Sequence, residues 1–169
     1  MAGPTVALFA TCVNDTMFPG TPDAVRRLLE RLGCTVVFPR QQTCCGQMFT
    51  NTGYFDEAVP SVRTFVEAFD TFDYVVGPSG SCVGAVRHQH PMLARHAGDA
   101  GLERAVGELT PRVYDLSEFI VDVLNTHRGG ALSHASQRRR LPHHPGSKWR
   151  PVLVRYLPEH QHPCGTPLS

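Results

Sequence analysis

Short apolar runs alternate with longer amphipathic stretches along residues 5–127. Mostly apolar runs at residues 6–10, 35–39 and 74–77 are bounded by polar or turn-forming residues, and runs of this length predict buried strands. Strands that alternate with helices pair in parallel, because each helix returns the chain to the start of the next strand. The pattern predicts an α/β fold with an open, mostly parallel sheet of three to four strands and flanking helices.

The first predicted helix has clear signals at both ends. Thr21 suits the N-cap, Pro22 suits the first helical position, and Gly33 suits the residue after the last turn. The apolar positions between them recur at helical spacing: Val25, Leu28, Leu29 and Leu32. This spacing predicts one helix with a single buried face.

Two further helices follow the second and third strands. Apolar residues over 58–69 predict a helix in which Pro60 lies in the first turn, because proline disrupts a helix interior. A third helix is expected from about residue 81 to residue 96 and places Cys82 in its first turn. A thiolate in that position gains from the helix dipole and from free backbone N–H groups, so we expect a lowered pKa for Cys82.

The pattern weakens toward the C-terminus. Residues 112–114 predict a short fourth strand, and Asp115 and Glu118 have the spacing of a capping box at the start of another helix. Residues 128–169 contain six prolines and five histidines and show no sustained periodicity. We therefore predict a single domain over 1–127 and a disordered tail over 128–169 that is rich in Pro, His and Arg.

Charge divides the chain at the same point. The 169 residues carry a net charge of +1, but residues 1–127 hold nine arginines against fourteen acidic residues. Residues 128–169 hold six arginines and one lysine against a single glutamate. A basic stretch of this kind is found in nucleic-acid-binding proteins, but it lacks interleaved aromatic residues, so we expect a solvated tail and no nucleic-acid partner.

Four cysteines follow the predicted strands. Cys12 comes after the first strand, Cys44 and Cys45 follow the second within a Cys-Cys-Gly sequence, and Cys82 follows the third. The carboxyl ends of parallel strands meet at one edge of a sheet, where ligands also collect. We therefore expect these four thiols to share one pocket. By contrast, Cys34 precedes its strand and is expected to be a packed core thiol at the opposite edge.

Four soft thiolates suit an iron–sulfur cluster or a tetrahedral zinc ion. Structural zinc sites usually contain two close Cys-x-x-Cys pairs, and that spacing is absent here. Buried apolar thiols without a metal are the alternative, because free cysteine is among the most buried residue types. A zinc-stabilised or metal-free binding module, or a nonfunctional remnant, is thus the competing interpretation. Cys164 lies in the predicted tail and receives no role.

Two other features have simpler explanations. The segment from Cys82 to Arg87 superficially resembles a thiol phosphatase loop, but only four residues separate the cysteine from the arginine, where those loops have five. His88, His90 and His96 could be ligands, but histidines on a predicted helix are more often solvated. No apolar stretch has the length of a membrane span, and no signal peptide is evident, so we expect a cytoplasmic protein.

At these cysteines the chain resembles the cysteine-rich CCG-domain family of iron–sulfur proteins. The family repeat has a lone Cys, an interval of some thirty residues, Cys-Cys-Gly, a similar interval and Cys-x-x-Cys; Ala85 stands where the last cysteine would lie. The segments 32–34, 44–47, 51–54 and 78–82 are most similar to the first half of the lactate-utilization members. The resemblance covers about residues 5–127.

The resemblance implies an iron–sulfur electron-transfer subunit of a complex that oxidises L-lactate. It implies a cluster, expected to be of the 4Fe–4S type, with Cys12, Cys44, Cys45 and Cys82 as its ligands, and partner subunits that carry further iron–sulfur centres. Family members have a second repeat that this sequence lacks, and a frameshift or truncation would explain the change in composition. We therefore expect a component of an oxidoreductase rather than a stand-alone enzyme, which does not sustain lactate oxidation by itself.

Overall fold

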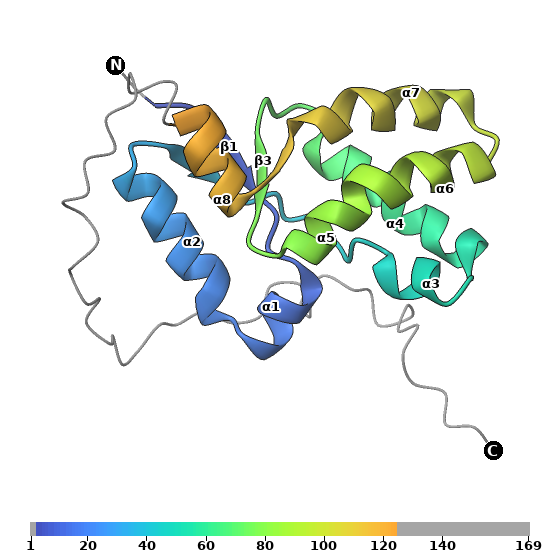
Figure 1. The fold of residues 1–169 in the computed structure, drawn as a ribbon, viewed down its shortest axis with the longest axis horizontal. Coiled ribbons are helices and arrows are strands. Elements are labelled where there is room, and N and C mark those ends of the chain that lie inside the picture. The colour runs from blue at the N-terminus through green and yellow to red at the C-terminus, as the bar shows by residue number, and fades with distance from the viewer. Residues whose placement is uncertain (1–2, 125–169) are drawn as a thin grey trace.

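The computed structural model describes residues 3–124 and contains one parallel sheet (Figure 1). Its strands are β1 (Thr5–Leu8), β2 (Thr35–Val37), β3 (Val75–Gly77) and β4 (Val113–Asp115), in the order β2-β1-β3-β4. All three neighbouring pairs are parallel. The predicted α/β class and the open parallel sheet are confirmed, and the fourth strand is present.

Helical segments connect the strands. In chain order they are α1 (Cys12–Met17), α2 (Gly20–Arg31), α3 (Gln47–Asn51), α4 (Phe55–Phe69), α5 (Gly80–Gly84), the π-helical turn η1 (Ala85–Gln89), α6 (His90–His96), α7 (Ala100–Leu109), the 3-10 turn η2 (Thr110–Arg112), α8 (Leu116–Glu118) and the π-helical turn η3 (Phe119–Leu124). None of the helices in the described part of the chain has the length and apolar character needed to cross a bilayer.

The two faces of the sheet bury different side chains, because successive residues of a strand point to opposite sides. Ala7 and Phe9 pack with α4 and with the segment after β3, whereas Val6 and Leu8 pack with α2 and η3. Figure 1 shows this division, with α2 and α8 on one side of the strands and α4 to α7 on the other. The sheet is therefore covered on both faces, as parallel sheets generally are.

The first predicted helix is present as α2, but it begins earlier than expected. It starts at Gly20, with Pro19 in the N-cap position, and no side-chain cap is formed. Thr21 instead lies in the first turn, where its backbone N–H donates to the carbonyl of Phe18. The predicted Thr21 cap is wrong. Only Phe18 and Pro19 separate α1 from α2, and the Phe18 carbonyl accepts the first-turn N–H of Thr21. Gly33 follows the helix with a positive φ, as predicted.

The second predicted helix is also longer than expected. α4 begins at Phe55, so Pro60 lies in the helix interior and not in the first turn. Packing of this helix on both sides explains why the proline is tolerated: Val62 contacts α6 and α7 residues, and Phe65 lies in the core against the sheet. Tertiary burial here outweighs the lost backbone hydrogen bond.

The third predicted helix, expected over residues 81–96, is present in three consecutive segments, α5, η1 and α6. The π-helical turn in its middle was not foreseen. The capping box is confirmed, because Asp115 accepts from the Ser117 N–H while Glu118 accepts from the Asp115 N–H. The predicted tail over 128–169, including Cys164, lies outside the described residues.

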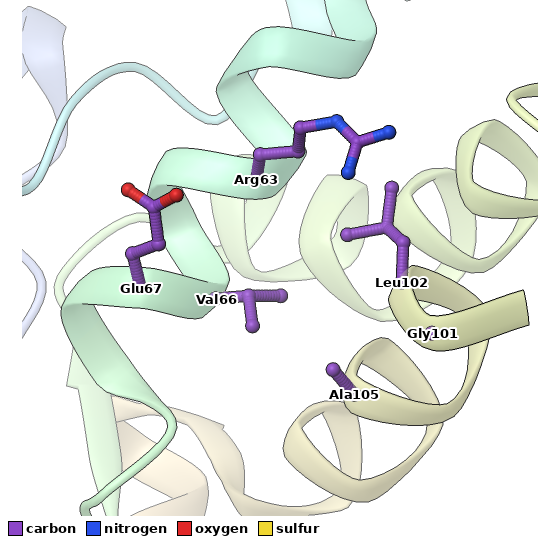
Figure 2. A pocket seen from close by; sticks show the side chains of 6 residues that line it. All are labelled: Arg63, Val66, Glu67, Gly101, Leu102 and Ala105. Carbon is purple, nitrogen blue, oxygen red and sulfur yellow. The ribbon is translucent and has the colours of Figure 1, made fainter. Parts of the chain in front are cut away.

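A shallow cavity of about 230 Å³ lies on the surface between α4 and α7, which pack together beneath it. Figure 2 shows its lining, in which Arg63, Val66 and Glu67 come from α4 and Gly101, Leu102 and Ala105 come from α7. The Arg63 guanidinium is paired with Asp99 at 2.8 Å. The cavity contains none of the cysteines, and its one cation already has an acidic partner.

Candidate metal centre

The structure brings Cys12, Cys44, Cys45 and Cys82 together at the carboxyl edge of the sheet. Cys12 is the first residue of α1, directly after β1, and Cys82 lies in α5, directly after β3. Figure 1 shows α1 and α5 at the same end of the strands. Cys44 and Cys45 lie in the loop between β2 and α3. The sulfur of Cys12 is 3.4 Å from that of Cys44.

The four sulfurs form a series of contacts in the order Cys12, Cys44, Cys45, Cys82. The Cys12 thiol donates to the Cys44 sulfur, and this hydrogen bond, with a second from Cys45, lowers the pKa of Cys44 to about 3. The same bond and burial raise the pKa of Cys12. The series therefore begins with a protonated thiol beside a thiolate.

The second half of the series repeats this alternation. Hydrogen bonds to Cys44 and Cys82, together with burial, raise the pKa of Cys45. The bond from Cys45 lowers the pKa of Cys82 to about 6, and the hydroxyls of Ser79 and Ser81 add to this effect. The predicted lowering of the Cys82 pKa is confirmed, but its leading cause is the neighbouring thiol rather than the start of a helix.

Backbone N–H groups also point at the sulfurs. Those of Val13, Gly46 and Gln47 donate to Cys12, Cys44 and Cys45 respectively. Gly46 turns the chain into α3 with a φ of 77°, a conformation that favours glycine. Hydrogen bonds to sulfur stabilise thiolates and tune the potential of a cluster bound to them.

Cys34 lies away from this group, as the sequence predicted. It precedes β2, is 6% exposed, and packs in the core on the α2 side of the sheet with Val25 and Leu29. Its environment is apolar, which is typical of a structural cysteine.

Gln42 is a buried residue of the site that the sequence pattern did not reveal. Its side-chain oxygen accepts from the Ala10 N–H at 2.9 Å, and its nitrogen donates to the carbonyls of Leu8 and Pro39 at 3.1 and 2.8 Å. It stands in a polar run, Arg40 to Thr43, that is typical of an exposed loop. No periodicity distinguishes Gln42 from its exposed neighbour Gln41.

His90 corrects the expectation of a solvated histidine. It is 1% exposed, its ring lies edge-on to Phe65, and its Nε2 is 2.9 Å from the carbonyl oxygen of Cys45. Because a carbonyl only accepts, Nε2 carries the proton. Burial lowers the pKa of His90 to about 4. His88 is exposed, and His96 pairs with Asp56 at 2.8 Å. The sequence does not show which groups each histidine contacts, so it cannot distinguish buried His90 from His88 and His96.

The donor set fits a soft metal or a metallocluster. Four sulfurs are present, two with lowered pKa values, and backbone N–H groups surround them. As the side chains stand, no group of three or more His, Cys, Asp or Glu residues within residues 3–124 is arranged around a single metal ion. Thiolate ligands of this kind suit both a tetrahedral zinc ion and an iron–sulfur cluster.

Comparison with known families identifies the domain that contains the four cysteines. The family described as a cysteine-rich domain, abbreviated CCG, matches residues 6–87. This region runs from β1 through α5 and includes all four cysteines of the site together with Gln42. No solved structure matches the chain.

Several curated relatives carry the name lactate utilization protein A. The protein from Oceanobacillus iheyensis is 39% identical over 148 residues, which cover 88% of this chain and 58% of the relative. Those from Exiguobacterium sp. and Geobacillus kaustophilus are 44% and 42% identical, and the alignments cover 76% of this chain and 52% and 53% of the relatives. The chain thus spans about half the length of these relatives.

Proposed function

Because this chain belongs to the cysteine-rich CCG domain family, we propose that Cys12, Cys44, Cys45 and Cys82 hold an iron–sulfur cluster that carries electrons. One observation carries the proposal: four thiols from three separate segments, α1, the β2–α3 loop and α5, meet in consecutive contact at one edge of the sheet. Chance burial of apolar thiols gives no reason for such convergence. An expected 4Fe–4S type agrees with the number of thiolates.

The protonation of the site supports ligand binding. Cys44 and Cys82 have lowered pKa values and are ready to bind as thiolates, whereas Cys12 and Cys45 release a proton when they bind. The bound cluster would supply one-electron transfer. The chain itself supplies ligands, backbone N–H donors to sulfur, and burial: Cys45 and Cys82 are 3% and 6% exposed, and Cys12 and Cys44 are half-buried. A cluster held by these residues would have its half-buried ligands, Cys12 and Cys44, on the side nearer the surface.

The relatives' name supports a role in lactate utilization. On this proposal the chain is an electron-transfer component of a complex that oxidises L-lactate, and partner subunits with further redox centres carry out the chemical step. It is a component of an oxidoreductase rather than an enzyme by itself. Reduced thiols are maintained in the cytoplasm, which is the compartment we propose for it.

Anaerobic purification followed by metal analysis tests the proposal. We expect iron and acid-labile sulfide in equal amounts, a brown colour, and an absorption band that bleaches on reduction with dithionite. Zinc without sulfide would support the zinc-stabilised binding module instead. A chain that binds neither metal after reconstitution with iron and sulfide would contradict the proposed function.

A further inference from the structure

Gln42 connects the end of β1, which leads into Cys12 and α1, to the loop that carries Cys44. Its three hydrogen bonds reach Leu8 and Ala10 at the end of β1 and Pro39 within its own loop. Ala10 lies two residues before Cys12, and Gln42 itself lies two residues before Cys44. The same side chain therefore anchors the chain just ahead of both cysteines.

The bonds of Gln42 are buried and use the whole amide. The residue is 3% exposed, so water cannot replace a lost partner. Both N–H groups of Nε2 donate, and Oε1 accepts, which fixes the orientation of the side chain. Residues 38–46 form no helix or strand. The side-chain amide of Gln42 therefore supplies hydrogen bonds between this loop and the end of β1, which backbone groups would supply in a pair of strands.

The backbone beyond Ala10 also needs this support. Thr11 is fully buried and has a φ of 63°, a conformation that a β-branched residue adopts only at a cost in free energy. This turn directs the chain from β1 into α1 and so sets the position of Cys12. An anchor at Ala10 holds the chain immediately before the strained residue.

We propose that Gln42 is a positioning residue that sets the separation of the Cys12 and Cys44 sulfurs and so controls assembly and potential of the cluster. The effect on cluster assembly and potential rests on the proposed function. The effect on the separation of the Cys12 and Cys44 sulfurs does not, and it applies to the cluster-free protein as well.

Two substitutions at Gln42 and one matched control test this role. Gln42→Met keeps the length of the side chain and removes all three hydrogen bonds, and Gln42→Glu keeps the acceptor for the Ala10 N–H. The control is Gln41→Met, because Gln41 is the exposed neighbour. Each full-length chain is reconstituted anaerobically with iron and sulfide, and circular dichroism reports whether it is folded.

The first readout is the cluster itself. We expect the Gln41→Met chain to match the wild type in iron content, visible spectrum and reduction potential. For folded Gln42→Met we expect cluster affinity to fall about 10- to 100-fold, as for other residues that support metal ligands. Gln42→Glu places a carboxylate oxygen against the Leu8 and Pro39 carbonyls, so we expect at least as large a fall in cluster affinity, with a shifted potential.

The second readout needs no cluster. Chelator-treated chains are oxidised with a diazene reagent: Cys12 and Cys44 lose two electrons and two protons, an S–S bond forms between them, and the diazene is reduced to the hydrazine. Peptide mapping under non-reducing conditions follows the linked Cys12 and Cys44 peptides. We expect the rate of linkage to fall about 10- to 100-fold in Gln42→Met and to stay at the wild-type value in Gln41→Met.

The outcomes separate this inference from the proposed function. If the wild type assembles no cluster but Gln42→Met still slows the linkage, the proposed function fails and the positioning role stands. Folded Gln42→Met with wild-type cluster content, potential and linkage rate would overturn the positioning role. If Gln42→Met does not fold, Gln42→Glu decides by the same criteria, and failure of both to fold would make Gln42 a folding residue and overturn the inference.

Discussion

A single hydrogen bond connects His90 on α6 to the backbone of the cysteine pair. The ring is fully buried, neutral and protonated on Nε2, and it donates to the Cys45 carbonyl. This contact fixes the peptide that follows Cys45 and leads into Gly46. The π-helical turn η1 immediately precedes His90, and such turns inside helices are frequent at functional sites.

Replacement of His90 by phenylalanine should lower the free energy of unfolding by about 1–3 kcal/mol, because the buried Cys45 carbonyl loses its donor while the aromatic volume is kept. Chemical denaturation measures the change. His88→Phe is the matched control, since His88 is exposed in η1, two residues before His90, and it should be nearly neutral. Equal effects of the two substitutions would show that the hydrogen bond contributes nothing.

The residues that carry chemistry differ in how far the sequence could reveal them. The four cysteines were predicted because each follows an apolar run, and parallel topology then fixes the edge at which they lie. Gln42 and His90 were not, because their importance depends on which backbone groups lie opposite them in the folded chain. Thr11 gave no signal either, since backbone conformation at one residue is not encoded in periodicity.

Among the elements, α3 begins directly after a glycine with a positive φ. Gly46 immediately follows the cysteine pair with a φ of 77°, and a Cβ there would lie 3.2 Å from the Cβ of Ser61. Both the conformation and the close approach exclude a larger residue without rearrangement. The start of α3 and the position of Cys45 are thus determined together.

Gly46→Ala should destabilise the fold by about 1–2 kcal/mol and displace the adjacent cysteines, because an L-residue is strained in the left-handed region. Gly107→Ala is the control: it lies within α7, and its added Cβ would meet nothing within 4 Å. We expect that substitution to stabilise the chain by about 0.5–1 kcal/mol. Thermal unfolding of both variants gives the comparison. Stabilisation by Gly46→Ala would contradict the conformation described for this turn.

The N-terminus of α7 provides a test by pH. Asp99 accepts from the Gly101 and Leu102 N–H groups, and its bond from Arg63 lowers the pKa of this carboxyl below 3.8. Because the pKa of Asp99 is lower in the folded chain than in the unfolded chain, its charge stabilises the fold at pH values above the unfolded-state pKa. This stability is lost as the pH falls through the folded-state pKa. The pair is exposed, so the contribution is small.

Asp99→Asn retains a good N-cap but removes the charge, so it should lower the melting temperature by about 1–4 °C at pH 7. Melting curves from pH 7 to about pH 2 should show this difference shrinking to zero as Asp99 becomes protonated in the wild type. Asp73→Asn, at an exposed aspartate before β3, is the control. A difference that persists unchanged at the lowest pH would exclude the ion pair as its cause.

Element boundaries show where sequence reasoning ends. The long helices α2 and α4 were predicted from their apolar spacing, whereas α1 and α3, of six and five residues, are too short to establish a helical period. Their sequences favour turns as much as helices. α1 begins at Cys12 and α3 begins two residues after Cys45, so the local geometry of the site was the part least accessible from the pattern.

For the whole molecule, the order β2-β1-β3-β4 explains why distant cysteines meet. β1 lies between β2 and β3, so the loops after these three strands are neighbours at the carboxyl edge. The strands and their parallel pairing could be predicted from apolar runs, and all three neighbouring pairs are parallel. The predicted tail over 128–169 and the predicted domain boundary remain predictions.

The iron and acid-labile sulfide content of a cysteine-to-serine series tests most directly whether these four residues hold a cluster. We predict that the wild type and Cys34→Ser bind equal amounts of iron and sulfide after anaerobic reconstitution, because Cys34 is buried on the other face of the sheet. Single serine substitutions at Cys12, Cys44, Cys45 or Cys82 should each lose most of both. Full iron and sulfide content in all four of these variants, or its loss only in Cys34→Ser, would contradict the account.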